Sequence, residues 1–162
     1  MPERKTIERA RQAARQGKRP TTQAGEFVRE EMEHIREGKH GARSTKQAIA
    51  IGLSKARRAG VKLGAPPKSA GEKTRQSAAS ASRRAHSRRK PSPTRSRAII
   101  GALKREGRQA ASHQALARQT RRVARRRGQA SLRAAAQKAV ATKGPKGRKA
   151  AARKAAATRS AA

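Results

Sequence analysis

Six arginines between residues 118 and 127 have a spacing that suits one kind of chemistry, the neutralisation of phosphate charge. They are Arg118, Arg121, Arg122, Arg125, Arg126 and Arg127. The first four recur every three or four residues, so they share one side of a helix. Guanidinium groups match phosphate oxygens through paired hydrogen bonds, and this run contains no acidic residue that would neutralise it from within. We therefore expect the run to bind an external polyanion.

Ten more basic residues complete the predicted nucleic-acid-binding set. They are Lys46, Lys55, Arg57, Arg58, Arg88, Arg89, Lys90, Lys146, Arg148 and Lys149. Duplex DNA carries about one negative charge per 1.7 Å of its axis, and each neutralised phosphate releases condensed counterions. Binding of this kind needs many cations but no defined pocket.

The residue combinations that could support metal binding or catalysis are incomplete in this sequence. His34 and His40 are close in sequence, but no Cys, Asp or third His nearby completes a metal site, so we predict surface histidines. Glu30 and Glu33 form a carboxylate pair that we expect on an exposed helix face, in contact with basic residues of the same chain. No serine has the His and Asp neighbours that would activate it as a nucleophile. We predict no enzyme, no catalytic residue, no cofactor and no metal.

The overall composition limits the size of any core. The chain has 162 residues with 44 Lys or Arg, nine Glu and no Asp, for a formal charge of +35. Leu, Ile, Val and Phe together number 16, well below the roughly 20% at which a highly charged chain is expected to be disordered. No cysteine is present, and no apolar run approaches the roughly 18 residues of a membrane span. We therefore expect a polycation in the cytoplasm.

The strongest folding signal is a helix from Ser44 to Gly60. Ser44 with Gln47 fits a capping box, and Gly60 suits a left-handed C-terminal cap. The small residues Ala48, Gly52 and Ala56 recur every four residues and form a face that another helix can approach closely. That face suits either a helix of this chain or a second copy of the chain in a homodimer. A second predicted helix at 25–37, ended by Gly38, would pair with it as a helical hairpin.

Composition divides the chain into five predicted segments. A basic N-terminal segment (1–24) precedes the helical hairpin (25–64); its residues 1–19 could form a short, weak helix but are too poor in apolar residues for stable packing. A Pro- and Ser-rich basic linker (65–95) leads to a pair of weak basic helices (96–128), predicted at 96–106 and 112–127, and to an Ala-, Lys- and Arg-rich disordered tail (129–162) with a break at 143–149. Residues 1–64 carry 16 basic and seven acidic residues, whereas the remainder carries 28 and two. The predicted fold class is mostly α with extensive disorder, a small hairpin followed by a basic arm.

Four segments resemble known proteins, and they do so in two ways. The segment KHGARSTKQAIAIGLSKARRAGVKLG, residues 39–64, is similar to a family of small uncharacterised bacterial basic proteins with a KQAIAIGLS-x-AR segment, and ALKREGRQAASHQALARQTRRVARRRG resembles the second half of some of them. That resemblance implies a helical region and no particular activity. KPSPTRSR and AAARKAAA resemble the tails of linker histones and bacterial histone-like proteins, which implies DNA binding through a basic tail.

Three functions are open at this point. The favoured one is a histone-like, nucleoid-associated protein that binds DNA with little sequence preference through phosphate neutralisation. The second is an RNA- or ribosome-associated protein, which the near absence of aromatic residues makes unsuited to stacking on single-stranded bases. The third is an interaction or stress protein in which the hairpin binds a partner and the polycationic tail supplies solubility.

Overall fold

The computed structural model describes residues 2–87 and 92–160, and helices account for most of them. The elements in chain order are α1 (Arg4–Arg15), α2 (Pro20–Arg36), α3 (Thr45–Arg58), α4 (Glu72–Arg83), the 3-10 turn η1 (Arg84–His86), α5 (Pro93–Lys104), the 3-10 turn η2 (Gln109–Ala111) and α6 (His113–Ser160). No strand occurs in these two ranges. The chain divides into two compact units, residues 1–117 and 118–162.

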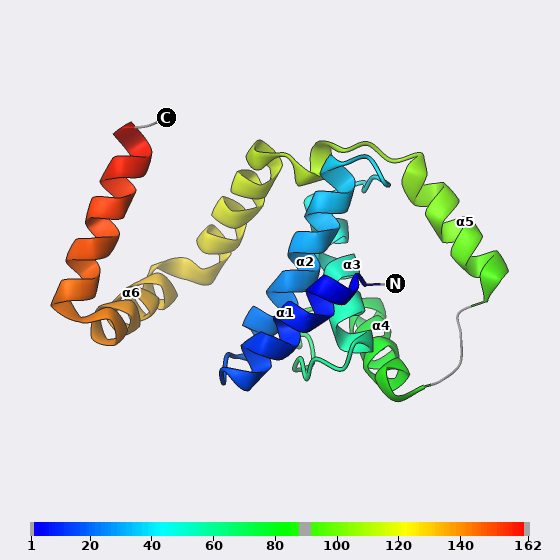
Figure 1. Ribbon diagram of the computed structural model, residues 1–162, viewed down its shortest axis with the longest axis horizontal. Coiled ribbons are helices and arrows are strands. Elements are labelled where there is room, and N and C mark those ends of the chain that lie inside the picture. The colour runs from blue at the N-terminus through cyan, green and yellow to red at the C-terminus, as the bar shows by residue number, and fades with distance from the viewer. Residues whose placement is uncertain (1, 88–91, 161–162) are drawn as a thin grey trace. The chain divides into compact units, whose positions relative to one another are not determined.

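The first unit is organised around the antiparallel hairpin of α2 and α3, which lie side by side in Figure 1. Both predicted helices are present, and α2 begins earlier than expected, with Pro20 in its first turn. The two helices approach so closely at Gly52 that a Cβ there would lie 2.7 Å from Cα of Val28. Ala48, Gly52 and Ala56 are therefore buried against α2 of the same chain. A second copy could use this face only by displacing α2.

The predicted caps of α3 are present, with one change of partner. The Ser44 hydroxyl accepts a hydrogen bond from the amide of Gln47 at 3.2 Å, as a capping box requires. The Gln47 side chain accepts from the amide of Arg43 at 2.8 Å, one residue earlier than the usual reciprocal bond. At the other end Gly60 has φ +90°, and the Val61 amide donates to the Ala56 carbonyl at 3.1 Å, which is the Schellman arrangement.

Helix α1 packs on the hairpin, so the prediction that residues 1–19 lack stable packing is wrong. Ala10 of α1 is buried together with Ala24 and Phe27 of α2 and Ala56 of α3. Alanine methyl groups let three helices approach closely without any large apolar side chain from α1. Phe27, the chain's one aromatic residue, lies 1% exposed in this cluster.

A second core cluster lies towards the other end of the hairpin, and a distant segment completes it. Met32 and Ile35 of α2 and Ala48 of α3 are buried with Ala110 and Ala111 of η2. The segment 103–111 is held to the hairpin by backbone hydrogen bonds. The Gly41 amide donates to the Leu103 carbonyl at 2.8 Å, and the Ala42 amide donates to the Gly107 carbonyl at 3.1 Å. A Cβ at Gly41 would overlap the carbonyl of Glu106, so this close contact requires glycine.

The predicted extensive disorder is wrong, because helices occupy most of the segments expected to be linker and tail. Helix α4 lies within the predicted linker and buries Ala78 and Ala81, in contact with α3. A serine and a proline of the predicted linker begin α5: the Ser92 hydroxyl accepts a hydrogen bond from the amide of Arg95, and Pro93 occupies the first turn. Residues 88–91 of the predicted linker lie outside the described residues. The high helix propensity of alanine explains the helical tail.

The second unit consists of most of α6. Gly128 (φ 72°, ψ 163°) and Gly144 (φ 62°, ψ 178°) interrupt the helical geometry, and Pro145 follows the second break. The helix end expected at Gly128 and the break expected within residues 143–149 are therefore present. Within residues 2–87 and 92–160, no helix combines the length and the apolar character needed to cross a membrane.

Candidate nucleic-acid interface

The second unit presents basic side chains without any acidic neighbour. Residues 118–162 contain 15 Lys or Arg and no Asp or Glu, and every basic residue among 118–160 is exposed. The nine that were predicted to bind nucleic acid are Arg118, Arg121, Arg122, Arg125, Arg126, Arg127, Lys146, Arg148 and Lys149. In the described residues, every ion pair lies between residues 3 and 55. The cations of this unit are thus available to an external anion.

The first helical stretch of α6 arranges its arginines in a row. Arg118, Arg121 and Arg125 are three and four residues apart on a helix that rises about 1.5 Å per residue, so the row is about 10 Å long. Arg122 joins this side, and its Nη2 donates to the Gln119 side chain at 2.6 Å. After the break at Gly144, Lys146 and Lys149 repeat the three-residue spacing on a separate helical stretch. Each stretch therefore offers one short cationic row.

The hairpin residues predicted to bind nucleic acid differ in their availability. Lys46 and Arg58 are exposed and make no described ion pair. Arg57 donates from Nη2 to the carbonyl of Gly64 at 3.0 Å and so holds the chain after α3. Lys55 is committed to intramolecular ion pairs, because its side chain is 17% exposed and its Nζ lies 2.7 Å from Glu31 Oε2. Arg88, Arg89 and Lys90 lie outside the described residues.

Lys55 belongs to a buried charged cluster that the sequence did not reveal. Its Nζ also lies 3.2 Å from Oε1 of Glu30, which is 3% exposed, so the prediction that Glu30 lies on an exposed face is wrong. Burial alone would raise the pKa of Glu30. Hydrogen bonds from the Thr6 side chain, the Glu3 amide and Lys55 outweigh that effect and leave the pKa below its ordinary value. Glu33, its predicted partner, is exposed.

The start of α1 adds a third carboxylate to this region. The Glu3 side chain lies 2.9 Å from Nε2 of His34 and 3.5 Å from Nζ of Lys39. The bond to His34 lowers the pKa of Glu3, and Lys39 contributes to the same effect. Lys39 also pairs with Glu37 at 2.9 Å, which raises the pKa of the lysine. Four glutamates, Glu3, Glu30, Glu31 and Glu37, thus belong to one network of ion pairs and hydrogen bonds.

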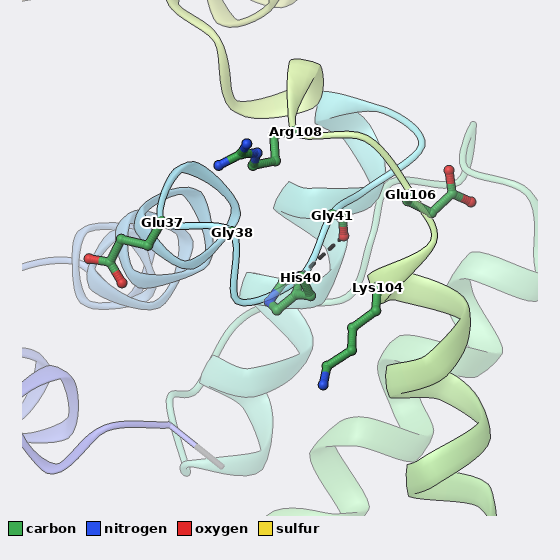
Figure 2. A pocket seen from close by; sticks show the side chains of 7 residues that line it. All are labelled: Glu37, Gly38, His40, Gly41, Lys104, Glu106 and Arg108. Carbon is green, nitrogen blue, oxygen red and sulfur yellow. Dashed lines mark hydrogen bonds between the residues drawn. The ribbon is translucent and has the colours of Figure 1, made fainter.

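A hollow of about 380 Å³ lies between the α2–α3 loop and the turn that follows α5. Figure 2 shows its lining, in which Glu37 and Glu106 point away on opposite sides and Arg108 lies over Gly38. His40 lines the hollow, and its Nδ1 lies 3.1 Å from the Gly41 carbonyl. The lining mixes two acidic side chains with Lys104 and Arg108, so its charge favours neither an anion nor a cation.

The prediction that His34 and His40 are surface histidines is wrong. Their side chains are 14% and 16% exposed, and their rings lie edge to face with centroids 6.0 Å apart. Glu31, fully buried, joins them, and one ligand atom from each of the three residues lies within 4.8 Å of the others. The sequence carried a signal for this cluster: Glu31 and His34 are three residues apart on one helix face, and Gly38 turns the chain back before His40. The third ligand is a glutamate, and not the Cys, Asp or third His whose absence led to the prediction of no metal site.

The hairpin is also where a relationship to known proteins is found. A model of a family of unknown function (DUF6496) matches residues 12–69, which include α2, α3 and their connecting loop. No curated protein and no solved structure gives a significant match to the chain. The matched range overlaps the KQAIAIGLS segment, so similarity to an uncharacterised family is supported there. The second unit lies outside the match.

Proposed function

We propose that this protein is a histone-like, nucleoid-associated protein that binds DNA with little sequence preference by neutralising phosphate charge. The observation that carries the proposal is the separation of charge between the two units. Acidic residues pair with basic ones in the hairpin, whereas 15 cations of residues 118–162 have no acidic residue among them. A polycation of this kind releases counterions whenever it replaces them on a nucleic-acid backbone.

The helical form of the second unit gives the proposed binding a definite geometry. Cations on one side of a helical stretch contact phosphates while those on the other side remain in solvent. The breaks at Gly128 and Gly144 separate the rows, so each row can bind its own stretch of backbone. None of these features commits a side chain to base edges, which is why we expect little sequence preference.

The salt dependence of binding by the full-length chain tests the proposal. If a third of the 28 basic residues in 65–162 contact phosphates, about nine contacts give a slope of log K against log salt near −8. Affinity would then fall by about four decades or more between 50 and 200 mM salt. Scrambled duplexes of equal length should bind equally. A slope of one or two, or strong preference for one sequence, would contradict the proposal.

A pair of charge-matched variants locates the binding. Arg121, Arg122, Arg125, Arg126 and Arg127 replaced together by Gln should flatten the slope by about four units, since each lost phosphate contact removes about 0.9. The control variant removes five exposed cations of α1 and its C-terminal turn: Arg4, Lys5, Arg11, Arg15 and Lys18, each to Gln. It should change the slope by less than about one unit. Equal changes of the slope in the two variants would mean that binding depends on the net charge of the chain and not on the arginines of α6.

The same titrations separate the remaining functions. Tighter binding to duplex RNA than to duplex DNA at equal salt would favour the RNA- or ribosome-associated alternative. Binding to neither nucleic acid at 150 mM salt would favour the interaction or stress protein. Crosslinking in cells, followed by recovery of DNA against RNA, would decide which polymer is bound there.

A further inference from the structure

We propose that Glu31, His34 and His40 form a binding site for a divalent transition-metal ion of the zinc class. Two imidazoles and one carboxylate are the protein ligands of a common type of zinc site, in which a water molecule occupies the fourth position. Imidazole nitrogen disfavours magnesium and calcium, which take oxygen ligands. This site is separate from the proposed nucleic-acid interface, and neither proposal depends on the other.

The hydrogen bonding of His40 orients one of its nitrogens for a cation. Nδ1 lies 3.1 Å from the Gly41 carbonyl, which can only accept, so Nδ1 carries a proton. In the neutral ring Nε2 then bears a lone pair, and it lies 3.4 Å from the Glu31 Oε1 oxygen. Two electron-pair donors that face each other require a cation to join them, either a proton on the ring or a metal ion.

The spacing of the donors suits a metal ion. Tetrahedral zinc with bonds of about 2.0–2.2 Å separates neighbouring ligand atoms by about 3.4 Å, which is the observed distance between His40 Nε2 and Glu31 Oε1. A ring nitrogen of His34 lies within 4.8 Å of both other ligand atoms. Binding of a common ion therefore requires the side chains to rotate until the wider separations close towards 3.4 Å.

The surroundings hold the donors in place and favour positive charge. Glu31 is 0% exposed, and neither of its carboxylate oxygens accepts a hydrogen bond, although Oε2 forms an ion pair with Lys55 Nζ at 2.7 Å. One carboxylate oxygen is thus fixed and the other is left for an ion. The Glu3 carboxylate at 2.9 Å from His34 fixes that ring, as the outer partners of metal-binding histidines do. The region also collects carboxylates in a chain whose net charge is strongly positive.

An ion at this site would connect two parts of the hairpin. Glu31 and His34 belong to α2, and His40 belongs to the loop whose Gly41 amide bonds to the Leu103 carbonyl. Metal binding would therefore stabilise the end of the hairpin and the attached 103–111 segment. A ligand that binds only the folded state stabilises it by RT ln(1 + L/Kd), where L is the ligand concentration, so the unfolding temperature rises with the logarithm of the ligand concentration relative to Kd.

Calorimetric titration of zinc into the full-length, untagged chain at pH 7.5 tests the site. We expect one ion per chain and, in the His34→Ala and His40→Ala variants, a loss of affinity of at least about 100-fold. His113→Ala is the matched control, because His113 is exposed, lies at the start of α6 and is not one of the three clustered residues. It should leave affinity unchanged. No binding to the wild type, or equal affinity of wild type and His40→Ala, would overturn the proposal and assign the Glu31–His40 contact to a protonated histidine.

The wild-type chain alone decides the matter if a histidine variant unfolds. Imidazole ¹⁵N resonances report metal coordination, and the chain has only four histidines. One equivalent of zinc should shift the resonances of His34 and His40, leave those of His113 in place, and raise the unfolding temperature. Shifts at His113 alone, or equal shifts at all four, would mean that zinc binds exposed histidines and that the cluster is not a site.

Discussion

The two units of this chain use the same residue types in opposite ways. In the first unit alanines form the core: Ala24 and Ala48 are fully buried, and Ala56 and Ala111 are as well. Among the described residues of the second unit, the alanines are exposed apart from Ala124, which is half-buried, and none of these residues is fully buried. The same contrast holds for charge, since Lys55 pairs with two buried glutamates while the cations of the second unit have no acidic neighbour.

This contrast shows that small residues build a core only where close backbone approach accompanies them. Gly52 lets α3 come within contact distance of the backbone of Val28, so methyl groups alone fill the space between the helices. The second unit is richer in alanine, with 15 Ala among its 45 residues against 21 among the 117 of the first unit, but within its described residues no second element packs against α6. Stability should therefore depend on substitutions in the first unit, and nucleic-acid affinity on substitutions in the second.

Breaking the charge pairing of the first unit should have the largest effect on stability. Lys55→Met would leave Glu30 and Glu31 buried without their cation, which costs about 3–5 kcal/mol for a buried pair. Urea unfolding followed by circular dichroism at 222 nm measures the change. Lys46→Met on the exposed side of the same helix is the control and should change the free energy of unfolding by less than about 0.5 kcal/mol. Equal effects would show that the buried pairs are not stabilising.

Gly52→Ala should have the next largest effect, and a second glycine sharpens the comparison. A Cβ at position 52 would lie 2.7 Å from Val28 Cα and 3.0 Å from its Cγ2. Overpacking costs about 1–3 kcal/mol and the gain in helix propensity returns about 1, so we expect a net loss of about 1–2 kcal/mol. At Gly101 in α5 the nearest atom would be 3.9 Å away, and alanine there should be neutral or stabilising. Urea unfolding measures both changes in the free energy of unfolding. A loss for Gly52→Ala with no loss for Gly101→Ala supports the close approach of α2 and α3, and stabilisation by both substitutions would contradict it.

The features of the fold that could be predicted from sequence are those fixed within a few residues. The caps at Ser44 and Gly60 and the break before Pro145 follow from local hydrogen bonding and backbone conformation, so residue type and spacing suffice. The burial of Lys55 could not be predicted in this way. Nothing within α3 distinguishes Lys55 from the exposed Lys46. The difference arises because glutamates of α2 lie against Lys55.

Distant contacts were missed for the same reason. Ala110 and Ala111 are buried by residues more than sixty positions earlier, and nothing in their own neighbourhood marks them as core. Helix α4 in the predicted linker and the helical tail depart from the prediction because the high helix propensity of alanine outweighs the charge and proline content of these segments. In the candidate interface, the exposure of the α6 arginines could be predicted from the sequence, because no acidic residue near them in the sequence could pair with them.

Loosening the 103–111 segment should have the smallest effect, and it tests whether this segment belongs to the core of the first unit. The Thr45 hydroxyl is buried and donates to the Ala110 carbonyl at 2.7 Å. Thr45→Val keeps the shape of the side chain but leaves that carbonyl without its donor, at a cost of about 1 kcal/mol.

Amide hydrogen exchange locates this cost. The Gly41 and Ala42 amides donate to residues 103 and 107, so their exchange should accelerate about fivefold while amides in the middle of α3 keep their protection. Thr142→Val provides the matched control in the second unit, where the hydroxyl donates to the Lys138 carbonyl at the same 2.7 Å but on an exposed helix surface. There water replaces the lost donor, so no exchange rate in the first unit should change. Unchanged rates at Gly41 and Ala42 in the Thr45 variant would mean that the backbone bonds, and not the threonine, hold the 103–111 segment to the hairpin.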